Sequence, residues 1–243
     1  MNASSHHIFP DRDALAVSVT AEVDRLLKLS AESGSILHLA LSGGSTPLAI
    51  FRKLRDVSSH REWSGIRLWW GDERCVPPDD AGSNYGNAYH LLIGPLNLSP
   101  GQVFRIRGED DPRQEARRYG NLLLEQLPVD HHGNPVFDWI WLGMGEDGHT
   151  ASLFPEEPAL WDAPAPCVVA THPGTGQSRI TITGRVINAA KRVTFLVTGK
   201  NKAEVVREVL RKEGRFREYP AAMVAPAGGK LEWYLDVDAA SEL

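Results

Sequence analysis

The sequence contains little cysteine and no long hydrophobic run. Its two cysteines, Cys75 and Cys167, are too few for the disulfide framework of a small secreted domain, and they form no Cys-x-x-Cys pair. No apolar run approaches the roughly 18 residues that cross a bilayer. Residues 1–10 also lack the charged and apolar stretches of a signal peptide. We therefore expect a cytoplasmic protein that does not enter a membrane.

The sequence also has no excess of positive charge. The chain has 26 basic and 31 acidic residues, so its net charge is −5, which disfavours nucleic-acid binding through a global basic field. The compositional biases of collagen, mucins and low-complexity disorder are missing too. What is present is ordinary for a globular protein: 42% of residues are hydrophobic and 23% are charged. A chain of 243 residues can bury a large core in one compact unit.

Segments typical of strands alternate with segments of helical periodicity. Leu15, Val19 and Val23 recur at helical spacing, with Asp11 or Asp13 available as a cap. Further helices are expected from the turn at 42–47 to about residue 55, at 112–126 and at 202–212, the last with Glu208 and Lys212 paired at i, i+4 on its exposed face. Strands are expected at 36–41, 66–70, 103–106, 138–142, 168–171, 179–183, 193–197 and 222–225. This alternation predicts an α/β fold, a doubly wound and mostly parallel sheet with helices on both faces, in a single domain over residues 1–243.

A glycine-rich turn, Ser42-Gly43-Gly44-Ser45-Thr46-Pro47, joins a buried strand to a helix. The glycines allow a ligand to approach the backbone, Ser45 or Thr46 can cap the helix, and Pro47 suits its first position. Free amides and the helix dipole at such a turn attract anions. The turn is therefore a candidate phosphate cradle, although ordinary strand-to-helix turns use the same residues. It is not a nucleotide P-loop, since G-x-x-x-x-G-K-[ST] is absent.

Three consecutive charged residues, Asp72, Glu73 and Arg74, follow the strand at 66–70. Ligands of open α/β sheets bind at the carboxyl ends of the strands. Arg74 can hold an anion or stabilise an oxyanion, and Asp72 can orient it or accept from a sugar hydroxyl. Asn84, further along, adds neutral hydrogen-bonding groups. A solvated charged loop is the alternative, and the position after a strand favours a functional role.

The turn after the strand at 138–142 matches the dinucleotide fingerprint G-x-G-x-x-G at residues 143–148. Two features argue against dinucleotide binding at this turn. Glu146 and Asp147 would lie against the pyrophosphate, and Pro155 leaves too little room for the long helix that should follow. We therefore do not expect a dinucleotide, and we look for another role for this turn.

Asp147 and His149 are candidates for acid–base catalysis at this turn. They are two residues apart in a glycine-flanked turn, so both can face one cleft. A neighbouring carboxylate orients an imidazole and favours its protonated form, which suits general-base catalysis near neutral pH. A loop histidine without a function is the alternative. The sequence has no G-x-S-x-G elbow to present a serine nucleophile and no spaced set of Cys and His to bind zinc. A metal held by Asp72, Glu73, Asp147 and His149 is disfavoured.

Together and in this order, these segments resemble the 6-phosphogluconolactonase family. The resemblance covers nearly the whole chain, at 42–47, 72–77, 83–84, 143–155, 179–183 and 198–203, and Gly-Glu-Asp-Gly-His-Thr-Ala-Ser-Leu-Phe-Pro is its most specific stretch. The related glucosamine-6-phosphate deaminases follow their Asp-Gly-His turn with a segment that ends Asn-Glu-Pro. Here that place holds Leu153-Phe154-Pro155, with Phe154 where the acid should be. The deaminases also have Asp-Glu-Tyr where this chain has Asp-Glu-Arg at 72–74.

The resemblance implies hydrolysis of 6-phospho-D-glucono-1,5-lactone in the pentose phosphate pathway, without a metal or other cofactor. It implies His149 as the general base, Asp147 as its orienting partner and Arg74 as an electrostatic stabiliser. The substrate-binding residues would be Ser42, Gly43, Gly44, Ser45, Thr46, Asp72, Asn84, Gly148, Arg179 and Lys202. Which cation besides the turn reaches the phosphate stays open, as does the choice between a monomer and a small homo-oligomer. The alternatives are an amino-sugar-phosphate deaminase/isomerase and a non-catalytic sugar-phosphate sensor.

Overall fold

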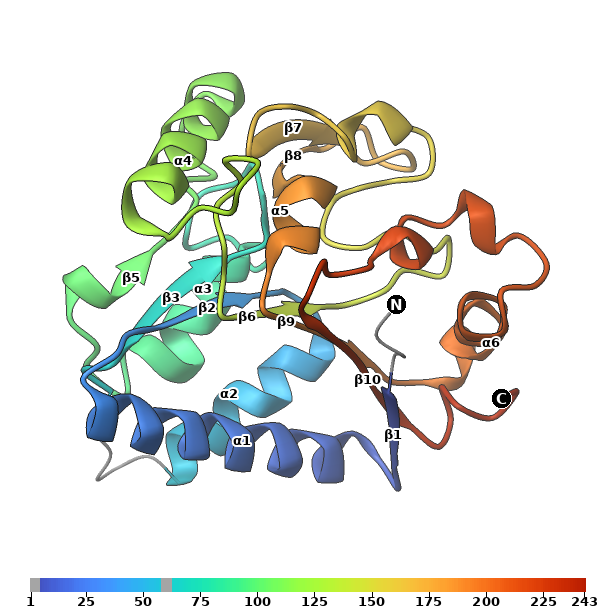
Figure 1. The fold of residues 1–243 in the computed structure, drawn as a ribbon, viewed down its shortest axis with the longest axis horizontal. Coiled ribbons are helices and arrows are strands. Elements are labelled where there is room, and N and C mark those ends of the chain that lie inside the picture. Colours follow the sequence, from blue (N-terminus) through green and yellow to red (C-terminus); the bar gives the residue numbers. More distant parts are fainter. Residues whose placement is uncertain (1–4, 58–62) are drawn as a thin grey trace.

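A seven-stranded parallel sheet forms the centre of the computed structural model, which describes residues 5–57 and 63–243 (Figure 1). The strands lie in the order β1-β10-β9-β6-β2-β3-β5, and each neighbouring pair is parallel. Their bounds are Ser5–Phe9 (β1), Leu37–Leu41 (β2), Ile66–Trp70 (β3), Val103–Phe104 (β5), Trp139–Leu142 (β6), Arg192–Val197 (β9) and Lys230–Asp236 (β10). The predicted parallel α/β architecture is confirmed.

Helices cover both faces of this sheet. On one face α1 (Arg12–Ser33) and α2 (Ser45–Val57) lie side by side, and α4 (Pro112–Gln126) and α5 (Gly184–Ala189) lie on the other (Figure 1). The shorter α3 (Asn84–Ala88) precedes a π-helical turn, and α6 (Ala203–Arg211) lies beyond β9. Because both faces are covered, the central strands are almost entirely apolar, and all four residues of β6 are buried. Within the described residues no helix is long and apolar enough to span a membrane.

A second sheet has three antiparallel strands in the order β4-β8-β7. They are β4 (Asp72–Arg74), β7 (Cys167–Thr171) and β8 (Ser178–Ile182). The strands expected at 168–171 and 179–183 therefore exist but lie outside the main sheet. The chain leaves that sheet at Gly71, whose N–H donates to Leu41 O at 2.9 Å and whose carbonyl accepts from Ile182 N at 2.9 Å. This junction brings β4 and β8 to the carboxyl edge of the main sheet.

The strand expected at 222–225 is wrong. Pro220–Met223 is a 3-10 turn, and the last strand is β10. Charged residues obscure β10 in the sequence, but the structure pairs one of them across the sheet: Glu232 Oε2 accepts from Arg192 Nε of the neighbouring strand at 2.5 Å. β1 was missed because it is an edge strand with four exposed residues.

The ends of the helices confirm some expectations and correct others. Asp11 caps α1 as expected, accepting from Ala14 N at 2.7 Å. Ser45 and Thr46 do not cap α2; they are its first two residues, and Pro47 is its third rather than its first. The Thr46 hydroxyl instead bonds Thr198 Oγ1 at 2.9 Å.

Candidate active site

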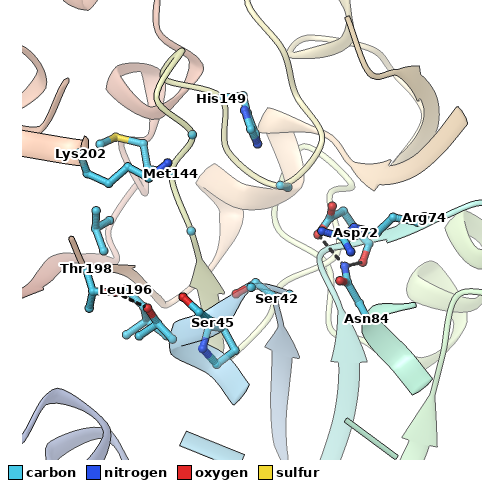
Figure 2. Close-up of a pocket in the computed structure, with 18 of the residues that line it drawn as sticks. Ser42, Ser45, Asp72, Arg74, Asn84, Met144, His149, Leu196, Thr198 and Lys202 are labelled. Carbon is cyan, nitrogen blue, oxygen red and sulfur yellow. Dashed lines mark hydrogen bonds between the residues drawn. The ribbon is translucent and has the colours of Figure 1, made fainter. Parts of the chain in front are cut away.

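The carboxyl ends of the main strands surround a cavity of about 280 Å³. Most of the residues predicted for the site line it: Ser42, Gly43, Gly44, Ser45, Thr46, Asp72, Arg74, Asn84, His149, Arg179 and Lys202. Asp147 and Gly148 do not line it. Figure 2 shows residues from separate stretches of the chain around one space, with His149 directed into it. Sequence reasoning missed Met144, Ala151 and Thr198, which line the cavity from turns whose other members it had identified.

The turn after β2 has the backbone features of an anion-binding turn. Gly43 packs so closely that a Cβ there would lie 1.9 Å from Asn84 Oδ1, and Gly44 has φ +101°, so a side chain would be crowded at the first position and strained at the second. The first intrahelical bond runs from Leu48 N to Gly44 O at 3.3 Å, which leaves the amides of Ser45 and Thr46 without intrahelical acceptors. The dipole of α2 adds partial positive charge here.

Lys202 supplies a full positive charge on the same side of the cavity. It ends the 3-10 turn Lys200–Lys202 that links β9 to α6. Figure 2 places it near Met144 and Thr198, across the cavity from Arg74 and Asn84. Burial lowers the pKa of its ammonium group, and the negative charges of Glu146 and Asp147 oppose that shift only in part. A ligand anion would offset that burial, so Lys202 and the α2 turn fit a phosphate together.

Two arginines form the opposite wall. Arg74 on β4 and Arg179 on β8 stand directly opposite each other in the antiparallel register. Arg74 Nη1 donates to Gly82 O at 2.5 Å, but the Nε groups of both arginines are buried without a partner among the described residues. Burial, followed by the nearby charge of Arg74, lowers the pKa of Arg179. Two close guanidinium groups that line the cavity fit a ligand oxygen that carries negative charge.

The acidic residues beside Arg74 have different roles. Asp72 is buried, accepts from Ser152 Oγ at 2.7 Å, and receives the Asn84 amide on its backbone oxygen at 2.9 Å. Glu73 is also buried and accepts from the backbone amides of Asn84 and Tyr85, each at 2.7 Å. Burial raises the pKa of Glu73, although these bonds oppose the rise. Glu73 therefore holds the loop that presents Asn84, and Asp72 joins that loop to the turn that carries His149.

His149 and Asp147 form a hydrogen-bonded pair. His149 Nδ1 lies 2.6 Å from Asp147 Oδ1, and the His149 backbone N–H donates to the same oxygen at 3.1 Å. Burial raises the pKa of Asp147, but its bonds to His149 outweigh that effect and leave the pKa below its ordinary value. Asp147 is thus a carboxylate at neutral pH. Since Nδ1 faces Asp147, Nε2 is the nitrogen left for a ligand. Gly145 allows this packing, because a Cβ there would lie 2.2 Å from both side chains.

Phe154 packs against the His149 ring. The ring centroids are 4.8 Å apart, and Phe154 is buried. The position where the deaminases carry an acid is therefore an apolar wall against the imidazole.

The disfavoured metal set is not assembled. In residues 5–57 and 63–243 no group of three or more His, Cys, Asp or Glu side chains is placed to hold a metal ion. Asp72 and Glu73 are engaged by Ser152 and by backbone amides, whereas Asp147 is engaged by His149. Metal independence of the reaction stays a prediction for experiment.

This fold and site define a known class. The chain belongs to the glucosamine-6-phosphate isomerases/6-phosphogluconolactonase family, whose model matches residues 10–233. It is 47% identical to a 6-phosphogluconolactonase of Treponema pallidum over 204 residues, which are 84% of this chain and 83% of the relative. A 6-phosphogluconolactonase of Haemophilus influenzae is 43% identical over 202 residues, 82% of this chain and 84% of the relative. The solved structure of the 6-phosphogluconolactonase from Trypanosoma brucei matches with a TM-score of 0.86 and 28% identity, covering 99% of this chain and 98% of that one. The resemblance seen in the sequence is confirmed.

Proposed function

We propose that this chain hydrolyses 6-phospho-D-glucono-1,5-lactone to 6-phospho-D-gluconate, as the names of its relatives imply for those proteins. The observation that carries the proposal is the His149–Asp147 pair at 2.6 Å, which opens onto a cavity with anion-binding groups on two opposite sides. We further propose that residues 1–243 act as one domain and that the reaction needs no cofactor.

The substrate has two ends, and each fits one side of the cavity. The 6-phosphate lies against the amides of the α2 turn and the ammonium of Lys202. The lactone carbonyl lies toward Arg74 and Arg179, whose guanidinium groups line the cavity and are suited to the charge that develops on its oxygen. Asp72 and Asn84 are close enough to this wall to orient the sugar hydroxyls.

The reaction then needs a single acid–base group. His149 Nε2 takes a proton from water as the water oxygen bonds to C1, and the electron pair of the carbonyl moves to its oxygen. Asp147 stabilises the imidazolium that forms. The electron pair on the former carbonyl oxygen then re-forms the C=O bond, the bond between C1 and the ring oxygen breaks, and Nε2 returns the proton to the ring oxygen, which leaves a carboxylic acid at C1. A lactone is an activated ester, so positioning and one base are sufficient.

The test is direct. The lactone is generated enzymatically, and acid release is followed with and without the protein, alongside the same assay on unphosphorylated glucono-1,5-lactone. We expect acceleration over the spontaneous rate that is much stronger for the phosphorylated lactone. A rate equal to the spontaneous background would overturn the proposal and favour a sensor. Release of ammonia from glucosamine-6-phosphate would instead indicate the deaminase, which the Phe154 wall disfavours.

A further inference from the structure

A covering segment at residues 216–223, used in no step above, packs on the turn that carries the catalytic pair. The segment consists of the 3-10 turns Phe216–Glu218 and Pro220–Met223 with Tyr219 between them. Ala221 N donates to Gly148 O at 3.0 Å. The Tyr219 ring is so close to Gly148 that a Cβ there would lie 2.4 Å from it. The segment therefore contacts the residue between Asp147 and His149.

The backbone conformation of Gly148 sets the relative positions of Asp147 and His149. Its φ of +76° is in the left-handed region, where a side chain would be strained. This backbone bend lets Asp147 Oδ1 meet both the ring and the backbone N–H of His149. A rotation at Gly148 would lengthen these contacts and move Nε2 in the cavity. A displacement of 1 Å can cost a catalysed step about 10²-fold in rate.

Tyr219 is itself anchored by a buried hydrogen bond. Its hydroxyl donates to Glu208 Oε2 at 2.7 Å, and the two residues are 5% and 8% exposed. Burial and then Glu208 raise the pKa of Tyr219 to about 12, so the hydroxyl keeps its proton at neutral pH. Glu208 belongs to α6, the helix that begins directly after Lys202. The helical pattern predicts Glu208 on the exposed face, paired with Lys212, and that prediction is wrong.

We propose that Tyr219 is a positioning residue for the His149–Asp147 pair, held by Glu208 so that its ring fixes the backbone of Gly148. The inference rests on the proposed function, because it concerns the placement of His149 as a base. Through α6 the same contact also ties the catalytic turn to the element that follows Lys202.

The test is Tyr219→Phe, which keeps the ring against Gly148 and removes only the hydroxyl that anchors it. We expect kcat to fall about tenfold or more, with KM within about twofold of wild type. Glu208→Gln keeps an oxygen acceptor for Tyr219 and should keep kcat within about twofold. The matched control is Tyr119→Phe, which removes another buried hydroxyl, bonded to Trp70 N and O at 3.0 and 2.9 Å. It should lower stability without lowering kcat.

A second readout does not depend on activity. The Nδ1 proton of His149 in a 2.6 Å contact should give a strongly downfield proton NMR signal. We expect this signal to move or broaden in Tyr219→Phe and to stay in place in Glu208→Gln and Tyr119→Phe.

The outcomes separate the two proposals. An inactive wild-type protein contradicts the proposed function, and the NMR signal alone then decides whether Tyr219 positions the pair. An active wild type with unchanged kcat and signal in Tyr219→Phe overturns the positioning role. Equal losses of kcat in Tyr219→Phe and Tyr119→Phe, each in proportion to the unfolded fraction, also overturn the positioning role. So does a loss of kcat in Glu208→Gln that equals the loss in Tyr219→Phe.

Discussion

Replacing Asp147 by asparagine removes one negative charge from the catalytic pair and almost no volume. Asp147 accepts from His149 through both the ring Nδ1, at 2.6 Å, and the backbone N–H, at 3.1 Å. The asparagine oxygen can still accept these bonds, so the turn should keep its shape. What changes is the stabilisation of the imidazolium that forms when His149 takes a proton from water.

The size of the effect follows from the hydrogen bond. A bond to a charged group contributes roughly 1.5–3 kcal/mol, and a neutral one roughly 0.5–1.5 kcal/mol. Because the Asp147 side chain is 40% exposed, solvent screens part of its charge, so the difference stays well below the roughly 2.5 kcal/mol that separates the extremes of these two ranges. A loss of about 1–1.5 kcal/mol in the transition state corresponds to a roughly tenfold fall in kcat.

The assay is acid release from the phosphorylated lactone over a range of pH. We expect kcat to fall roughly tenfold and KM to change little, because the carboxylate acts on the imidazolium that forms in the reaction and not on the bound substrate. The control is Asp138→Asn, a carboxylate bonded to His38 N at 2.8 Å at the other end of β6. Wild-type kcat in Asp147→Asn, or an equal loss in Asp138→Asn, would refute the reasoning.

Three further predictions concern binding, stability and metals. Lys202→Met should raise KM for the phosphorylated lactone about 10- to 100-fold and leave kcat nearly unchanged, since a charged hydrogen bond is lost; an equal effect on unphosphorylated lactone would contradict the assignment. Arg25, and after it Arg192, lower the pKa of Glu22 from 4.5 to about 2. The pKa of Glu22 is thus lower in the folded protein than in the unfolded chain. The stabilisation that its bonds to the two arginines give is therefore complete above pH 4.5 and lost as pH falls toward 2. The difference in unfolding free energy between wild type and Glu22→Gln should shrink over that window, and a constant difference in denaturant titrations would contradict it. Dialysis against a chelator should leave lactone hydrolysis intact, whereas a loss restored by added metal would show that the reaction needs one.

Local chemistry was predictable from the sequence, and long-range juxtaposition was not. Asp147 and His149 are two residues apart, so their contact is contained in one turn. The anion-binding turn at 42–47 follows a continuous apolar strand, and its place at the carboxyl edge follows from the fold class. Because the sheet is parallel, both segments lie at its carboxyl edge, around one cavity.

Features that depend on distant pairing were missed. The face-to-face placement of Arg74 and Arg179 depends on the antiparallel register of β4 and β8, which no local pattern encodes. Ser152 was passed over because only the fold brings its hydroxyl to Asp72. Glu208 has the spacing of an exposed residue, and its burial depends on Tyr219 from a later segment. In each case a polar group finds its partner only after the chain has folded.

The most direct measurement of the central claim is the rate of 6-phosphogluconolactone hydrolysis by the wild-type protein and by His149→Ala, each compared with the spontaneous rate. A general base contributes roughly 10²–10⁴-fold to such a reaction. We predict clear acceleration by the wild type, a fall in kcat of that order in His149→Ala, and unchanged binding of 6-phosphogluconate to the variant. Wild-type kcat in His149→Ala would contradict the account.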